Sequence, residues 1–286
     1  DVRLSEYAKI AKRCGPEDTV IVAKNRSGIA ALLAAEKFKY PIIYIYICPF
    51  ELESILIYHD LFREKLRKEA NDLRNRLGLK PVDSWISWQC SPKVHLGIWT
   101  KWFYNESNEW PGKVDPVGYP GVSSEKLSQN TLSDDLQTIF DEDPSPLLIT
   151  GGTSKQIKPE FYSSAISACE ILGKKTILVT RYKEFVPDCL PPNITWFNYI
   201  PLDEIMPRIS AIIHHGGIGT AMGATYAATP QMILAYNVDR PMNGMIIKSL
   251  GIGEYLPPLR WDPKLIAEKI TDLLQPEFKQ KCLEFA

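Results

Sequence analysis

The chain of 286 residues is 45% hydrophobic and 23% charged, a composition typical of a globular protein long enough for two domains. Its 33 Lys and Arg residues balance 34 Asp and Glu residues, and the net charge of -1 argues against a nucleic-acid partner. The longest apolar stretch, residues 40–50, is shorter than the about 20 residues of a membrane-spanning helix, and no signal peptide is recognised. These features predict a cytoplasmic protein without a transmembrane segment.

The first part of the chain alternates between helical and strand patterns. Helices are expected over residues 1–14 and 29–37, and strands over 19–24 and 41–48. Such alternation indicates a parallel sheet covered by helices. The six cysteines lie far apart without a C-x-x-C pair, so free thiols and no zinc site are expected.

An amphipathic helix follows over residues 59–79, with apolar side chains at helical spacing among charges of both signs. A solvated helix face accounts for this pattern, and peripheral contact of its basic side chains with an anionic membrane is the alternative. Further on, residues 123–145 are polar and acidic, which is typical of a linker. The expected division is a first domain over 1–122, a linker over 123–145 and a second domain over 146–286.

The second half alternates more regularly. Strands are expected over 147–150, 175–180, 194–197, 211–214 and 231–236, with helices over 159–172, 203–208, 221–228 and 243–250. This order indicates a doubly wound sheet of Rossmann type, in which ligands bind at the carboxyl ends of the strands. The predicted fold class is therefore α/β with two Rossmann-like domains.

A glycine-rich loop lies at one of these strand ends. Strand 211–214 runs through His215 into Gly216, Gly217 and Gly219 and then into a helix. Free backbone N–H groups and the positive end of a helix bind phosphate well, and the Thr220 hydroxyl adds a further donor. The loop lacks the Gly-Lys-Ser/Thr of a P-loop and the complete G-x-G-x-x-G of a dinucleotide fold.

Two adjacent histidines precede these glycines. Successive strand side chains point to opposite faces, so His214 and His215 do not both address one ligand. We expect one of them to pack in the core and the other to donate a hydrogen bond to a diphosphate.

Asp239 and Arg240 follow the next strand. Their carboxylate and guanidinium groups suit the hydroxyl groups of a sugar. Asp239 also follows Gly219 by twenty residues, the separation at which dinucleotide folds place a ribose-binding acid, so a nicotinamide enzyme stays an alternative. A solvated turn with an Asp–Arg pair is the third interpretation.

The segments 197–224, 228–233 and 239–243 together resemble the donor domain of nucleotide-sugar glycosyltransferases of GT-B fold. Within that group, the pattern is most similar to the bacterial and fungal enzymes that glycosylate sterols, polyketides and glycopeptide aglycones. The earlier segments 71–81, 91–92, 110–111 and 117–120 resemble the later part of the acceptor domain more loosely.

The resemblance implies roles for individual residues. The donor diphosphate would be held by His215, Gly217, Gly219 and Thr220, with Thr153 on its other side. The nucleobase would meet the backbone around Ile200 and Leu202, and the sugar would meet Asp239 and Arg240. Arg240 stands where the family usually has glutamine, so the identity of the sugar stays open.

The resemblance does not place the catalytic base in this chain. The opening strand and catalytic histidine of the family would precede Asp1, and neither His59 nor His95 matches that position. The first domain is therefore expected to be incomplete by about 100 residues. Asp239 is the remaining candidate for a base within the chain.

The function implied is inverting transfer of a sugar from a UDP- or dTDP-sugar to a hydroxyl of a small lipophilic acceptor. The nucleotide-sugar is a co-substrate, and neither a metal nor another cofactor is expected, since loop N–H groups and a helix end can stabilise the leaving diphosphate. Three alternatives stay open: a nucleotide-sugar epimerase, a nicotinamide oxidoreductase, and a donor-binding module or subunit inactive by itself.

Overall fold

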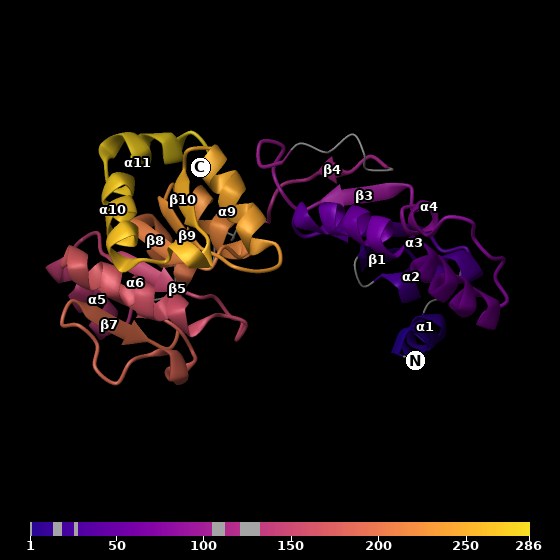
Figure 1. The fold of residues 1–286 in the computed structure, drawn as a ribbon, viewed down its shortest axis with the longest axis horizontal. Coiled ribbons are helices and arrows are strands. Elements are labelled where there is room, and N and C mark those ends of the chain that lie inside the picture. Colours follow the sequence, from indigo (N-terminus) through magenta and orange to yellow (C-terminus); the bar gives the residue numbers. More distant parts are fainter. Residues whose placement is uncertain (1, 14–18, 26–27, 105–111, 121–131) are drawn as a thin grey trace. The chain divides into compact units, whose positions relative to one another are not determined.

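The computed structural model describes residues 2–13, 19–25, 28–104, 112–120 and 132–286. The chain divides into two compact units, Asp1–Pro120 and Gly121–Ala286 (Figure 1). Trp110 and Pro111, which carried part of the predicted resemblance, lie outside the described residues.

The first unit contains a four-stranded parallel sheet in the order β1-β2-β3-β4. Its elements in chain order are α1 (Val2–Arg13), β1 (Ile21–Lys24), α2 (Ile29–Phe38), β2 (Ile42–Tyr46), α3 (Phe50–Arg76), α4 (Trp85–Gln89), β3 (Val94–Gly97) and β4 (Asp115–Pro116). The alternation predicted for residues 1–48 is therefore present.

Helix α3 is longer than the sequence indicated. It begins at Phe50 rather than near His59, and it is interrupted at Phe62, whose backbone angles are not helical (φ -132°, ψ 20°). Glu51 in its first turn is buried and accepts a hydrogen bond from the backbone N–H of Ile47, which ties the helix start to the end of β2. The helix therefore extends N-terminal of the amphipathic stretch on which the prediction rests.

The second unit contains a six-stranded parallel sheet in the order β10-β9-β8-β5-β6-β7. Its strands are β5 (Leu147–Thr150), β6 (Thr176–Val179), β7 (Ile194–Phe197), β8 (Ala211–His214), β9 (Gln231–Leu234) and β10 (Gly253–Leu256). Its α-helices are α5 (Asp134–Glu142), α6 (Pro159–Leu172), α7 (Leu202–Ile205), α8 (Ile218–Tyr226), α9 (Arg240–Ser249), α10 (Pro263–Leu273) and α11 (Pro276–Leu283). Short 3₁₀ helices are η3 (Lys183–Phe185), η4 (Met206–Arg208) and η5 (Pro258–Arg260).

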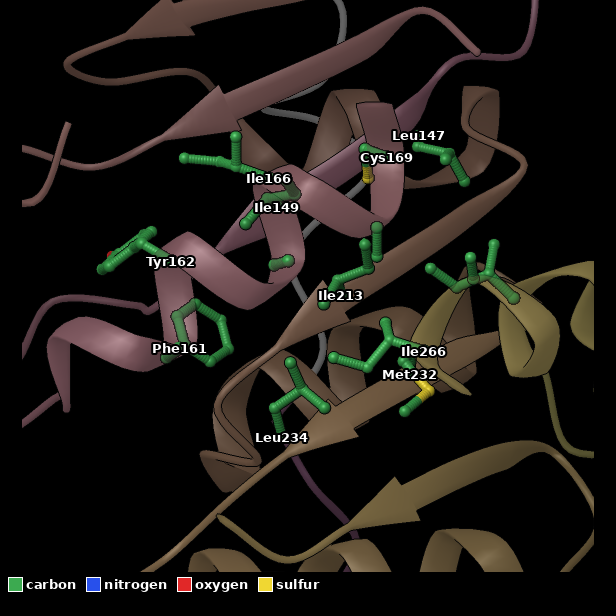
Figure 2. Close-up of a cluster of buried hydrophobic side chains, with 14 of the residues drawn as sticks. Leu147, Ile149, Phe161, Tyr162, Ile166, Cys169, Ile213, Met232, Leu234 and Ile266 are labelled. Atoms are coloured by element: carbon green, nitrogen blue, oxygen red, sulfur yellow. The ribbon is translucent and has the colours of Figure 1, made fainter. Parts of the chain in front are cut away.

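Both faces of this sheet are buried. Figure 2 shows one core cluster, in which side chains of β5, β8 and β9 meet those of α6 and α10. Its members include Leu147, Ile149, Ile213, Met232, Leu234, Phe161, Ile166 and Ile266. The strands are accordingly near-continuous apolar runs, as expected for a parallel sheet covered on both sides, and the predicted doubly wound fold is confirmed.

The structure differs from the sequence prediction over the expected linker, 123–145. Residues 134–142 of that stretch form helix α5, and its Leu136, Ile139 and Phe140 pack against the other face of the second unit's core. The charged residues of this segment lie on the opposite side of an amphipathic helix, which is why composition alone indicated a linker.

Candidate functional site

The strand order of the second sheet reverses between β5 and β8. From β5 the strands proceed through β6 to β7, and β8 then pairs with the other side of β5 and continues to β9 and β10. Thr150 and His214 are partners in the register of this pair, so the loops that follow them leave the sheet at the same level. In doubly wound sheets such a switch point is where ligands bind.

The two loops at this point meet around the His215 ring. A Cβ atom added to Gly152 would lie 2.5 Å from Cε1 of His215, and one added to Gly217 would lie 2.5 Å from its Nε2. Only residues without a side chain leave space for the imidazole between these loops. The structure thereby brings together the loop of Thr153 and the loop of Gly217, as the sequence analysis predicted for a shared ligand.

His215 is neutral in this environment. Burial, together with the neighbouring His214 ring and Arg240 guanidinium, lowers its pKa to about 3. Its side chain is 8% exposed, and its Nδ1 is buried without a hydrogen-bond partner. The neutral imidazole therefore carries one N–H donor and one acceptor, without a formal charge of its own.

His214 has a different environment. It is fully buried, its Nε2 lies 3.1 Å from Oε1 of Gln231, and its Nδ1 accepts a hydrogen bond from the N–H of Gly216 at 3.2 Å. The expectation that one of the two histidines packs in the core therefore applies to His214.

The start of helix α8 completes this side of the site. Gly217 is its N-cap residue, and the first intrahelical backbone bond is donated by Ala221 to the Gly217 carbonyl. The N–H groups of Ile218, Gly219 and Thr220 therefore have no acceptor within the helix. They and the helix dipole favour an anion beside Gly219, which is exposed, and Thr220, which is half-buried.

The loop of Thr153 is held by the side chains around it. The hydroxyl of Tyr162 accepts a hydrogen bond from the Gly151 N–H, and Thr150 Oγ1 accepts one from the Gly152 N–H. The Tyr182 hydroxyl donates to the Thr153 carbonyl at 2.8 Å. The Thr153 residue itself is exposed, so its side chain is accessible to a ligand.

Asp239 and Arg240 lie at the start of helix α9, several residues earlier than the predicted helix. Asn243 connects this helix to the glycine loop, since its Nδ2 donates to the Gly216 carbonyl at 3.0 Å and to Oδ2 of Asp239 at 2.9 Å. Arg240 is 8% exposed and donates from Nη1 to the Gln156 carbonyl at 2.6 Å. Arg240 thus holds the loop after β5, a structural role that the sequence analysis missed.

The two residues expected near the nucleobase follow β7, on the other side of β6 from β5. The Ile200 side chain is buried in the core cluster that also contains Ile205 and Met206, and Leu202 packs against this cluster. The Ile200 side chain is therefore structural and leaves its backbone atoms for the predicted contact, whereas Leu202 is half-buried.

The histidines of the first unit are engaged locally. His95 is buried, with Nδ1 2.8 Å from the Tyr46 hydroxyl and Nε2 2.7 Å from the Pro92 carbonyl. His59 stacks on Trp85 with ring centroids 6.2 Å apart. That neither is the catalytic histidine of the family stays a prediction.

Among the described residues, no three His, Cys, Asp or Glu side chains are grouped so that they could hold a metal ion. Four cysteines of the described residues are free thiols: Cys90, Cys169, Cys189 and Cys282. No helix in the described part of the chain has the length and apolar character needed to span a membrane.

Comparison with known proteins agrees with this architecture. Residues 175–284 match the family described as erythromycin biosynthesis protein CIII-like, C-terminal domain. O-mycaminosyltylonolide 6-deoxyallosyltransferase of Streptomyces fradiae is 26% identical over 203 residues, which are 68% of this chain and 45% of the relative. The chain therefore spans less than half the length of this curated relative.

Two solved structures show the same fold over nearly the whole chain. The glycosyltransferase of kitacinnamycin aligns with a TM-score of 0.75 at 14% identity, covering 99% of this chain and 74% of that one. The spinosyn rhamnosyltransferase SpnG, in complex with thymidine diphosphate, aligns with a TM-score of 0.72 at 17% identity, covering 99% and 71%. The predicted resemblance is confirmed: residues 175–284 match the EryCIII-like C-terminal domain family, and the chain shares the fold of solved GT-B glycosyltransferases.

Proposed function

We propose that the second unit binds a nucleoside-diphosphate sugar with the diphosphate between the loops 151–154 and 215–220. The observation that carries this proposal is the packing of His215 between Gly152 and Gly217 at the switch point of the sheet. An imidazole N–H, the free N–H groups of α8 and the Thr220 hydroxyl all suit phosphate oxygens. The protein as a whole is proposed to transfer the sugar to a hydroxyl of a lipophilic natural product.

In this proposal the site acts mainly on the leaving group. As the bond between the anomeric carbon and the diphosphate breaks, negative charge grows on the diphosphate oxygen. Donors already fixed in a buried site stabilise that charge without reorganisation. His215 contributes a neutral donor, and the buried Arg240 contributes a positive charge close to it. Inversion at the anomeric carbon follows if the acceptor hydroxyl attacks from the opposite side.

The sugar is proposed to lie against Asp239 and Arg240. Oδ2 of Asp239 accepts a hydrogen bond from Asn243, which fixes the carboxylate and leaves Oδ1 for a sugar hydroxyl. The nucleobase is proposed to meet the backbone at Ile200 and Leu202. Thymidine diphosphate in the SpnG complex makes dTDP-sugars the first donors to test, with UDP-sugars second.

A titration of the full chain with UDP, dTDP, GDP and NAD tests the proposal. We expect UDP or dTDP to bind and to raise the thermal midpoint, since a ligand at a hundredfold excess over its Kd stabilises by about 2.7 kcal/mol. His215→Ala should weaken that binding by about 1.5 to 3 kcal/mol, as expected for a hydrogen bond to a charged group. His59→Ala in the first unit is the matched control. Binding of NAD alone would support the nicotinamide alternative instead.

A further inference from the structure

The last side chain of β8 forms two hydrogen bonds inside the core. Nδ1 of His214 accepts from the Gly216 N–H, and its Nε2 faces Oε1 of Gln231. A backbone N–H can only donate, so Nδ1 carries no proton and Nε2 donates its own to Gln231. The tautomer of His214 is thereby determined by the loop that follows it.

The hydrogen bonds continue from β9 to helix α8. Nε2 of Gln231 donates to Oγ1 of Thr225 at 3.0 Å, and the Thr225 hydroxyl donates to the Ala221 carbonyl at 2.9 Å. Gln231 and Thr225 are 0% and 2% exposed. A continuous chain of hydrogen bonds therefore runs from α8 through Gln231 and His214 to the Gly216 N–H. In each of these bonds, the neighbouring group determines which partner donates.

The Gly216 peptide is the first bend of the diphosphate loop. Its φ is +85°, a left-handed value, and a Cβ there would lie 2.9 Å from the Arg240 carbonyl. This peptide lies directly between His215 and the N-cap residue Gly217. Its orientation therefore determines both the direction of the His215 ring and the point at which α8 begins.

We propose that His214, Gln231 and Thr225 form a positioning network for the diphosphate loop. The inference rests on the proposed function, because it assigns these residues to the same phosphate site. Apolar side chains could fill this part of the core, whereas buried polar groups destabilise a core unless each has a partner. The network orients the loop: it holds the Gly216 N–H toward strand β8, so that His215 and the N–H groups of α8 face the ligand.

Two substitutions of His214 separate positioning from packing. In asparagine, as in histidine Nδ1, the polar atom is bonded to Cγ, so His214→Asn keeps an acceptor for the Gly216 N–H. In glutamine the polar atoms are one bond further out, so His214→Gln keeps a partner for Gln231 and removes that acceptor. Both variants leave one buried group unpaired, and their thermal midpoints can be compared directly.

The measurements are hydrogen exchange of the Gly216 amide and the affinity for UDP and dTDP. We expect His214→Asn to keep the Gly216 amide protected and its nucleotide affinity within about threefold of the wild type. In His214→Gln we expect the Gly216 amide to exchange faster by about tenfold or more. We expect the Kd of this variant for UDP or dTDP to rise by about tenfold or more as well. Equal behaviour of the two variants in both measurements would overturn the proposal.

A second pair uses Thr225, where the change in volume is small. Thr225→Val removes the hydroxyl that accepts the hydrogen bond from Gln231, and Thr225→Ser retains this hydroxyl. The valine variant should speed Gly216 exchange and the serine variant should restore protection; equal exchange in both would also overturn the network. Absence of nucleotide binding by the wild-type chain would instead refute the proposed function, because the exchange measurement needs no ligand.

Discussion

Substitution of Gly217 by alanine tests how closely the two loops hold His215. The backbone at Gly217 has φ -63° and ψ 137°, values that alanine adopts without strain, so the effect of the substitution is steric. The new methyl group would lie 2.5 Å from Nε2 of His215, whereas ordinary contacts begin at 3.4 Å. The ring must move by about 1 Å, away from the donors of α8.

Two consequences follow from this displacement. Overpacking should lower the free energy of unfolding by about 1 to 3 kcal/mol. Loss of the His215 hydrogen bond should weaken UDP or dTDP binding by about 10- to 150-fold, the equivalent of about 1.5 to 3 kcal/mol. Calorimetric titration measures the affinity, and urea denaturation measures the stability.

A control and a double variant make the reasoning refutable. Gly223→Ala lies in the same helix, and its methyl group would meet only the flexible Met206 side chain, so nucleotide affinity should not change. In a His215→Ala background, Gly217→Ala should cause little further loss, because the ring that it displaces is absent. Independent, additive losses would show that Gly217 acts on the ligand by another route.

Three further predictions concern the surrounding residues. Asp239→Asn should weaken binding of a UDP- or dTDP-sugar while leaving the affinity for the bare nucleotide nearly unchanged; equal losses in calorimetry would place this carboxylate at the ribose or in the fold. Arg240→Ala removes the hydrogen bond to Gln156 and the adjacent positive charge, so nucleotide affinity should fall by about tenfold and amide exchange in loop 154–157 should rise; unchanged exchange there would contradict the structural role. Burial lowers the pKa of His214 to about 4 and of His215 to about 3, below the unfolded value of about 6.5. Below pH 6.5 the unfolded chain therefore binds more protons than the folded chain. The contribution of each histidine to the free energy of unfolding is fully present above pH 6.5 and is lost as the pH falls, by up to about 2 kcal/mol per histidine at pH 5. Urea denaturation across this pH range checks the slope, and a reduced slope in His215→Asn is expected.

Much of the second unit could be predicted because its signals are local. The strands are short apolar runs, and two of them, β5 and β8, are followed by loops that contain glycines. Alternation of side chains along β8 separates His214 from His215. By contrast, the hydrogen bond between Arg240 and Gln156 joins positions 84 residues apart, and it ends on a backbone carbonyl that any residue type provides. No periodicity or composition reports such a contact.

Other features were missed for related reasons. Composition predicts a linker where helix α5 lies because the three core side chains of the helix are separated by acidic and polar residues. The need for glycine at position 152 arises from the His215 ring, which reaches it from the end of a different strand. The hydrogen bond from Asn243 to the Gly216 carbonyl likewise joins two segments whose arrangement in space the sequence does not specify.

The most direct test of the account is a structure of this chain in complex with UDP or dTDP. The account predicts that the diphosphate oxygens lie within hydrogen-bond distance of a His215 ring nitrogen and of the N–H groups of Gly219 and Thr220, with loop 151–154 on the other side. A diphosphate bound away from His215, or no bound nucleotide at saturating concentration, would contradict it.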